Sequence, residues 1–293
     1  MNLILTVIEV VAPVAVLAVI GFVWVKLGFE YRLEFVTRLS MTLGVPCLIF
    51  TALMKTEINP ATLAAVSLAA LAAYGGLTFI FWGLTRALDL EMRTYLAPLI
   101  FGNTGNLGLP IALFAFGETG LGYAVVIFAV MAVLSFTFGV WLVSGGGSPL
   151  KALREPMVGA TLLGAVFLWQ GWQTPVWITH SLELVGQLAI PLMLITLGVA
   201  IGRITPGGVT RAIWLSALRT VLCVGVAGAA GLLFGLDPIA FAVLVVQVST
   251  PVAVTSYMMA EKYGADAPQV AGLVIISTLL SVITLPLTLA FLM

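Results

Sequence analysis

The sequence predicts an all-α polytopic membrane protein with ten transmembrane helices. Of its 293 residues, 61% are hydrophobic and only 8% are charged, and the apolar residues fall into long runs. Soluble domains carry about 25% charged residues, and a helix needs about 20 apolar residues to cross a bilayer. The net charge of zero indicates no nucleic-acid partner, so the lipid bilayer is the expected environment.

Charged and turn-forming residues divide the apolar sequence into ten runs. The first run is too long for a signal peptide and is interpreted as a membrane helix. Cys47 and Cys223 lie inside runs without a CxxC partner, so we interpret them as small apolar residues rather than metal ligands or a disulfide. The expected spans are 3–25, 34–54, 61–85, 94–116, 121–143, 157–173, 182–202, 211–235, 238–260 and 268–292.

The basic residues predict the orientation of these spans. Of the 12 lysines and arginines, only Lys55 falls in a loop or helix end on one face, and the other 11 fall on the opposite face. The positive-inside rule makes the basic face cytoplasmic. We therefore expect a multi-pass protein of the cell inner membrane with both termini periplasmic or extracellular.

Prolines at matching positions predict an internal repeat. Pro46 and Pro191 are 145 residues apart, and Pro110 and Pro251 are 141 apart, each close to half the chain. Five spans per half is an odd number, so the second half would be inverted relative to the first. Inverted repeats with broken helices are typical of secondary transporters, although prolines also produce ordinary kinks in membrane helices.

The two halves are expected to meet in a short cytoplasmic connector. The first inverted repeat would cover 1–143, the connector 144–156 and the second repeat 157–293. Phe116-Gly117 recurs as Tyr263-Gly264 in the second half, after the proline-containing span.

The fourth span contains an unusually polar segment. Glycine and proline disfavour helix, and open backbone is tolerated at membrane depth only where it lines a cavity or packs on protein. An opened helix offers N–H groups that hold an anion, and asparagines add neutral donors and acceptors. The candidate substrate-binding residues here are Asn103, Thr104, Gly105, Asn106 and Pro110.

The ninth span repeats this pattern around a second proline break. Polar side chains surround the break, and both breaks would reach the same midplane region. Such groups also hold membrane helices together, which is the alternative interpretation. The candidates are Gln247, Ser249, Thr250, Pro251, Thr255 and Ser256.

Ionisable residues are scarce at the depth of these breaks. The sequence places no Asp, Glu or His there, so no metal site or cofactor is expected and coupling to Na⁺ or H⁺ through a buried carboxylate is not supported. Carbonyls and hydroxyls could still hold sodium. Arg219, the deepest basic residue, would be an anion partner, snorkel to the cytoplasmic headgroups or form a structural pair. Gly198 and Gly202 form a small-xxx-small pattern suited to close helix packing.

The segment from Asn103 to Pro110, Asn-Thr-Gly-Asn-Leu-Gly-Leu-Pro, resembles the fourth-helix signature of the auxin efflux carrier family. That family includes plant PIN-type exporters and bacterial relatives described as malonate or malate permeases. Ser249-Thr250-Pro251 and the segment from Ser277 to Ser281 resemble its ninth and tenth helices. The resemblance covers nearly the whole chain.

The resemblance implies the fold of bile-acid/sodium symporters, with crossed broken helices 4 and 9. It implies a scaffold of helices 1, 2, 6 and 7, a core of helices 3–5 and 8–10, and a homodimer. Small organic anions would bind near Asn103 and Asn106. The chain departs from the symporters because the ninth helix lacks their sodium-binding acidic residue.

The sequence therefore predicts a secondary transporter of a small organic anion that works by alternating access. A non-transporting membrane sensor with a carrier fold is the alternative. An intramembrane enzyme is not expected, because aspartyl proteases need two mid-span aspartates and serine proteases need a Ser–His pair. The only histidine, His180, falls in an outer loop.

Overall fold

The computed structural model describes residues 3–55, 59–145, 156–203 and 208–292, and the described regular elements are all helical. Most of the expected connector, with Lys151 and Arg154, lies outside the described residues. The helices are α1 (Leu3–Lys26), α2 (Leu33–Leu39), α3 (Val45–Lys55), α4 (Pro60–Ala87), α5 (Met92–Ile100), α6 (Leu109–Leu134), α7 (Val140–Ser144), α8 (Pro156–Gln170), α9 (Val176–Arg203), α10 (Val209–Leu233), α11 (Pro238–Ser249), α12 (Val254–Tyr263) and α13 (Ala267–Leu292). Three π-helical turns join consecutive helices: η1 (Ser40–Gly44), η2 (Thr104–Gly108) and η3 (Ser135–Gly139).

Six helical segments among the described residues are long and apolar enough to cross a membrane. This finding confirms an all-α membrane protein, whereas the count of ten spans and the inverted repeat stay predictions. The fourth and fifth expected spans meet at Gly117, where a φ of +64° breaks the helical path inside α6. The six segments are Leu33–Lys55, Ala61–Ala87, Thr104–Ser144, Val176–Arg203, Val209–Leu233 and Ala267–Leu292.

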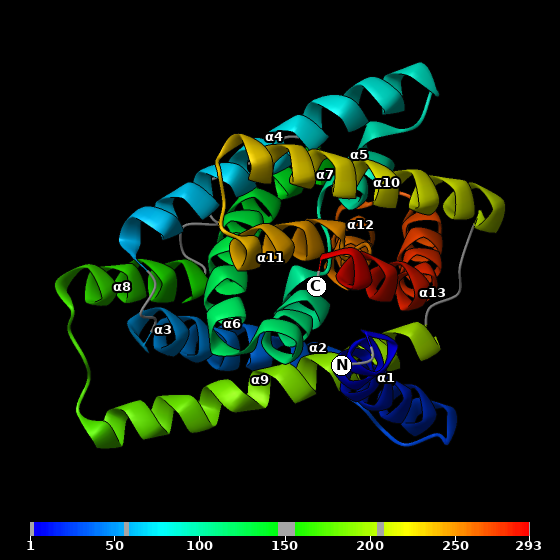
Figure 1. The fold of residues 1–293 in the computed structure, drawn as a ribbon. Helices are drawn as coiled ribbons and strands as arrows, with labels where there is room; N and C mark the ends of the chain where they lie inside the picture. Colours follow the sequence, from blue (N-terminus) through cyan, green and yellow to red (C-terminus); the bar gives the residue numbers. More distant parts are fainter. Residues whose placement is uncertain (1–2, 56–58, 146–155, 204–207, 293) are drawn as a thin grey trace.

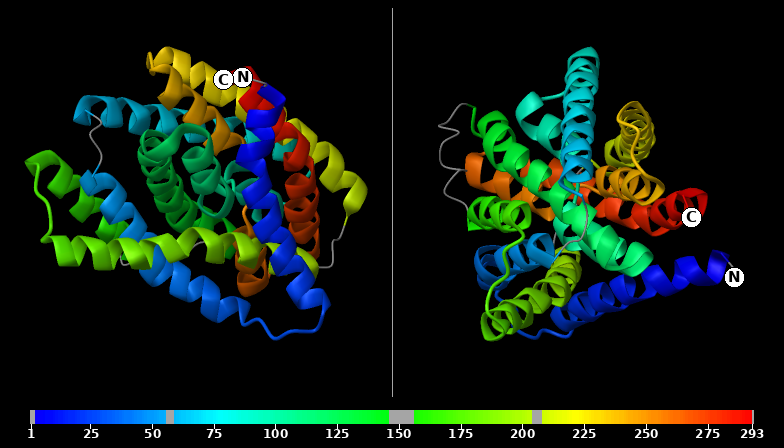
Figure 2. Two further views of the ribbon diagram at one scale, coloured as in Figure 1. Left: turned by 60° about the horizontal axis from the view of Figure 1, so that its bottom comes forward. Right: turned by 60° about the vertical axis from the view of Figure 1, so that its left-hand side comes forward.

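The helices form two groups that face each other. Figure 1 shows α1, α2, α3 and α9 on one side of the molecule and α4, α10 and α11 on the other, with α6 between them. The right-hand view in Figure 2 shows the same separation. Along α9 lie α1 and α3, and α3 also packs on α8, whereas α10 packs on α4, α11 and α13.

Close packing of α1 on α9 confirms the role predicted for the small residues of the seventh span. A Cβ atom added to Gly198 would collide with the backbone of Ala18, and one added to Gly21 would collide with the backbone of Ile195. A Cβ atom added to Gly202 would meet Phe22 and Val25 of α1. The glycines therefore let two membrane helices approach to backbone contact.

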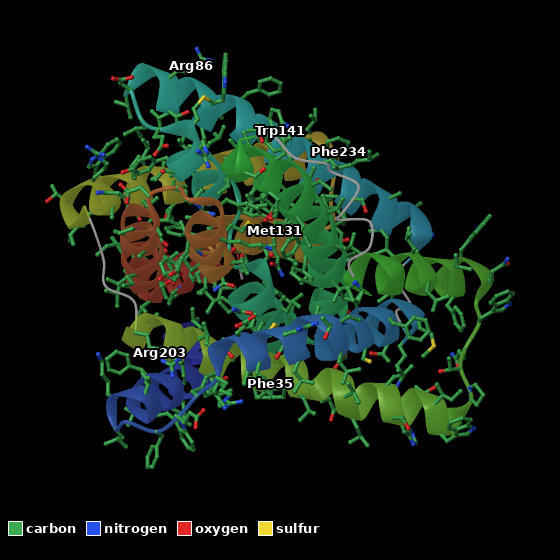
Figure 3. All side chains as sticks on the ribbon, turned by 180° about the vertical axis from the view of Figure 1, so that it is seen from behind. Phe35, Arg86, Met131, Trp141, Arg203 and Phe234 are labelled. Carbon is green, nitrogen blue, oxygen red and sulfur yellow. The ribbon has the colours of Figure 1, made fainter. Side chains whose placement is uncertain are left out.

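The ends of the helices alternate between two sides of the molecule. In Figure 1 the junctions α8–α9 and α10–α11 lie on the left, and the junction α4–α5 lies on the right. Figure 3, viewed from behind, shows Arg86 and Arg203 on one side and Phe234 to their right. Arg86 lies in the last turn of α4 and Arg203 is the last residue of α9, whereas Phe234 follows the last residue of α10.

Among the described residues, the longest unbroken buried stretches surround two interruptions in the helices. Every residue from 94 to 112 and from 242 to 254 is buried inside the protein. These stretches include the end of α5, the start of α6, most of α11 and the start of α12. The interior of this membrane protein is therefore centred on broken helices rather than on a continuous one.

Candidate functional site

Two broken helices meet backbone to backbone in the interior. After α5 the chain is extended at Phe101, with φ −94° and ψ 120°, and after α11 it is extended at Thr250, with φ −53° and ψ 148°. Gly102 pairs with Val252 in an antiparallel bridge, and the N–H of Asn103 donates to the carbonyl of Pro251 at 2.7 Å. We call the segments 101–103 and 250–253 the paired breaks. Each break satisfies backbone groups of the other, which membrane interiors require.

Local chemistry explains why the chain opens at these positions. Pro251 has no N–H and forces the residue before it out of the helical region, which ends α11. A Cβ on Gly102 would collide with the hydroxyl of Thr250 and lie 2.9 Å from its carbonyl oxygen. Only a glycine at this position lets the two breaks approach closely enough to pair.

Pro110 does not form the first break, which corrects the sequence interpretation. It lies within a continuous helical segment that begins at Thr104, directly after the π-helical turn η2. The helix opens earlier, at Gly102. Gly105 lies in the following π-helical turn, where a Cβ atom would lie 3.0 Å from the ring of Phe128.

Unpartnered polar atoms gather at the paired breaks. Among the described residues, nine buried side-chain atoms lack a hydrogen-bond partner, and six of them belong to residues at or beside the breaks. Leaving a buried donor or acceptor unpaired costs about 1–3 kcal/mol, so such a cluster marks a place where a ligand can bind. The six atoms are Asn103 Nδ2, Thr104 Oγ1, Asn106 Oδ1, Arg219 Nη2, Gln247 Nε2 and Gln247 Oε1.

The hydroxyls before the second break serve the local helix. Ser249 donates to the carbonyl of Val246 at 3.2 Å, and Thr250 donates to that of Gln247 at 2.7 Å. These geometries favour the structural interpretation for both residues. Ser277 of α13 also supports the break, because its hydroxyl accepts from the N–H of Val252 at 3.0 Å. Sequence reasoning did not assign this role to Ser277, although a hydroxyl in an apolar span was a usable signal.

A small cavity adjoins the first break. It has a volume of about 20 Å³, room for about one water molecule. Asn106 and Thr255 line it from the broken helices, and Ser256 is buried one residue further along α12. Its other lining residues, which sequence reasoning did not single out, are Leu33, Thr37, Ser40, Met193, Thr196 and Val254.

A tyrosine outside the membrane spans touches a residue of this cavity. The Tyr31 hydroxyl and the Thr196 hydroxyl are 2.7 Å apart. Burial raises the pKa of Tyr31, against the smaller opposing effects of this hydrogen bond and the charge of Arg203. The phenol therefore stays neutral at physiological pH and holds the loop before α2 against α9.

A larger cavity opens on the face that carries Lys55. It has a volume of about 640 Å³ and lies between α3, α9 and the first half of α6. Lys55 forms an ion pair with Glu183 at its rim, and Glu118 lines it as well. The remaining lining residues are Leu48, Thr51, Ala52, Leu113, Phe114, Leu121, Gln187, Ile190 and Pro191. We call this space the outer cavity.

Arg219 does not snorkel, so that alternative is wrong. Its side chain is 1% exposed, its Nε donates to the Leu99 carbonyl at 2.9 Å, and its Nη1 donates to the Thr250 carbonyl at 2.7 Å. Arg219 thus joins the candidate residues at the paired breaks, where it contacts backbone carbonyls.

The structure brings the predicted site residues together from both halves of the chain. Two mutually paired helix breaks with unsatisfied polar side chains, set among membrane-length helices, are typical of membrane transport proteins. A family model described as Membrane transport protein matches residues 6–148 and 140–289. The chain belongs to this family, that of the auxin efflux carriers.

Curated relatives agree with this assignment. The chain is 28% identical over 294 residues to an uncharacterized transporter of Methanothermobacter thermautotrophicus, covering 95% of this chain and 96% of the relative. It is 25% identical over 274 residues to a protein of Rhizobium meliloti whose name proposes malonate transport, covering 83% and 81% of the two chains. An uncharacterized transporter of Methanocaldococcus jannaschii is 26% identical over 201 residues, or 64% of each chain.

Proposed function

We propose that this protein is a secondary transporter of a small organic anion, such as malonate or malate. The observation that carries the proposal is the cluster of unpartnered buried polar atoms at the paired breaks. A dicarboxylate offers several acceptor oxygens, and four of the six unpartnered atoms can donate to them: Asn103 Nδ2, Thr104 Oγ1, Arg219 Nη2 and Gln247 Nε2. The name of the Rhizobium meliloti relative supports the same chemical class.

The charge of the site also favours an anion. Arg219 Nη2 is a donor without a partner at the breaks, and the ion pairs among the described residues, Arg32–Glu30 and Lys55–Glu183, place no acidic side chain beside it. The starts of η2 and α12 add free N–H groups and positive helix-dipole ends. Asn103 and Asn106 would bind the carboxylate, with Thr104, Gln247, Thr255 and Ser256 around it.

The proposed architecture is two inverted repeats, covering 1–143 and 157–293. Support comes from the pairing of one break from each half, and from Gly117 and Gly264, whose φ angles of +64° and +70° end corresponding half-helices. The scaffold would consist of α1, α2–α3, α8 and α9, and the other helices would form the moving core. This division follows the two groups of helices in Figure 1.

Alternating access would move the core against the scaffold. The outer cavity would give access from one side, whereas the cavity of about 20 Å³ beside Asn106 is too small for a carboxylate. The basic helix ends Arg86 and Arg203 share one side of the molecule, which supports a cytoplasmic assignment for that side. Both termini would then be periplasmic or extracellular in the inner membrane, and the transporter would form a homodimer through the scaffold.

Uptake of labelled malonate into proteoliposomes tests the proposal. We expect uptake to be saturable and to fall at least tenfold in Asn103→Ala and Asn106→Ala. Asn59→Ala is the matched control, because Asn59 is exposed and caps the first turn of α4. Normal uptake by both site variants would overturn the proposed site. No uptake of any mono- or dicarboxylate by the wild type would overturn the proposed substrate class.

A further inference from the structure

Arg219 is a buried positive charge that makes no ion pair among the described residues. It lies near the middle of α10, its side chain is 1% exposed, and the two ion pairs found elsewhere do not involve it. Charged side chains in a membrane interior are rare and usually functional, and they pair with one another or with backbone carbonyls. The compensation for this charge therefore has to come from the backbone.

The carbonyl ends of the two half-helices before the breaks provide that compensation. Leu99, whose carbonyl accepts from Nε, lies in the last turn of α5, and Thr250, whose carbonyl accepts from Nη1, follows the last residue of α11. The C-terminus of a helix carries roughly half a negative charge. Two such ends meeting at one guanidinium together offset about one positive charge.

In transporters with broken helices, unwound backbone carbonyls and half-helix C-terminal ends are the groups that bind the coupling Na⁺. The carbonyls of Leu99 and Thr250 are groups of this kind, and a guanidinium already occupies them. The residues present therefore do not favour a sodium ion at this point.

We propose that Arg219 is a built-in cation that replaces a bound alkali ion at the paired breaks. Because the charge is covalently attached, the breaks stay neutralised in every state of the cycle and folding of the core needs no sodium. Arg219 acts as a positioning residue, since it holds the ends of α5 and α11 together. One consequence of this inference, that the rate of transport is independent of sodium, rests on the proposed transport function. The structural role of Arg219 does not depend on it.

Close packing around the guanidinium supports a permanent role. A Cβ on Gly102 would lie 3.1 Å from Nη2, so the break fits closely around the arginine. Tyr74 is buried as well, and its ring lies 6.1 Å from that of Phe101 in the first break. Removing the arginine side chain would leave carbonyl oxygens facing an enclosed space that a small cation could enter.

Thermal unfolding of the purified full-length protein tests this proposal without any transport measurement. The protein is compared in NaCl, KCl and choline chloride at equal ionic strength, and with millimolar methylguanidinium added. We expect the midpoint of the wild type to be the same in all three salts. R219A should unfold roughly 5–10 °C lower in choline, and Na⁺ or methylguanidinium should recover part of the loss.

Arg93 provides the matched control. It also donates to two carbonyls near helix ends, those of Val143 at 3.0 Å and Tyr263 at 2.8 Å, but its side chain is partly exposed. Water can replace it there, so R93A should show no cation-specific recovery. If R219A does not fold, R219Q and R219K are compared in its place. Only the lysine variant keeps a positive charge, so its unfolding midpoint should remain insensitive to sodium.

Two results would overturn the proposal. One is a saturable, sodium-specific stabilisation of the wild type. The other is an R219A or R219Q protein that folds but responds to neither Na⁺ nor methylguanidinium. Failure of the wild type to transport malonate would remove the proposed function and leave these unfolding results valid. If transport occurs, replacing sodium with choline should leave its rate unchanged.

Discussion

Replacing Gly102 with alanine perturbs the paired breaks at the point where the two chain segments are closest. The added Cβ would collide with the Thr250 hydroxyl, and it would lie 2.9 Å from the Thr250 carbonyl oxygen and 3.1 Å from Arg219 Nη2. Two of these atoms are backbone or tightly bound groups, so the breaks have to separate. We therefore expect Gly102→Ala to destabilise the core and to distort the anion site with it.

The magnitude follows from two contributions. Overpacking of a close-packed interior costs about 1–3 kcal/mol. Loss of the hydrogen bond from Asn103 to Pro251 adds about 0.5–1.5 kcal/mol. A total of about 2–4 kcal/mol would lower the unfolding midpoint by roughly 4–15 °C for a chain of this size.

Thermal unfolding and malonate uptake of purified protein measure this effect. The matched control is Gly225→Ala in α10, where no heavy atom lies within 4 Å of the added Cβ. Alanine there raises helix propensity, and we expect the control to be as stable as the wild type or more so by about 0.5–1 kcal/mol. If the Gly102 and Gly225 variants unfold at the same temperature, the two breaks do not depend on each other for stability.

Three further substitutions separate other features of the fold. Ser277→Ala removes the acceptor of the Val252 N–H and should cost about 1–3 kcal/mol in unfolding free energy, unless water replaces the hydroxyl. Gly198→Leu should separate α9 from the backbone of α1 and lower the yield of folded protein, whereas Gly159→Leu, at an exposed glycine with open space around it, should not. Lys55→Gln breaks an exposed ion pair, so stability should change by less than about 1 kcal/mol. Malonate uptake by the Lys55→Gln variant should nevertheless be slower than that of the wild type at low salt. Equal uptake rates at low and high salt for both proteins would refute a steering role for this lysine.

The sequence was sufficient to predict the helical membrane class and the two segments that meet in the interior. Length and hydropathy report directly on the bilayer, and polar residues at membrane depth are rare enough to be informative. Asn103, Asn106 and Gln247 were therefore found without a structure, and the structure leaves polar atoms of all three without partners. The number of spans and their symmetry rest on the sequence pattern alone.

The position of the first break and the role of Arg219 depended on contacts between distant segments. Pro110 looked like a helix breaker because proline removes a backbone donor, yet the helical segment that begins at Thr104 continues through it after the π-helical turn η2. The actual opening at Gly102 is set by Thr250, which lies far along the chain. The position of Arg219 along its own helix likewise could not show that the carbonyls of Leu99 and Thr250, at the ends of α5 and α11, converge on it.

The pairing of the breaks also has a consequence for how the protein is made. The ribosome delivers Gly102 to the membrane long before it has synthesised Val252, the partner that completes the bridge. Until then the first break exposes polar backbone that lipid cannot satisfy. Newly inserted chains should therefore remain vulnerable to membrane proteases until α11 and α12 have entered the bilayer, and a chain truncated before α11 should be degraded rather than stored.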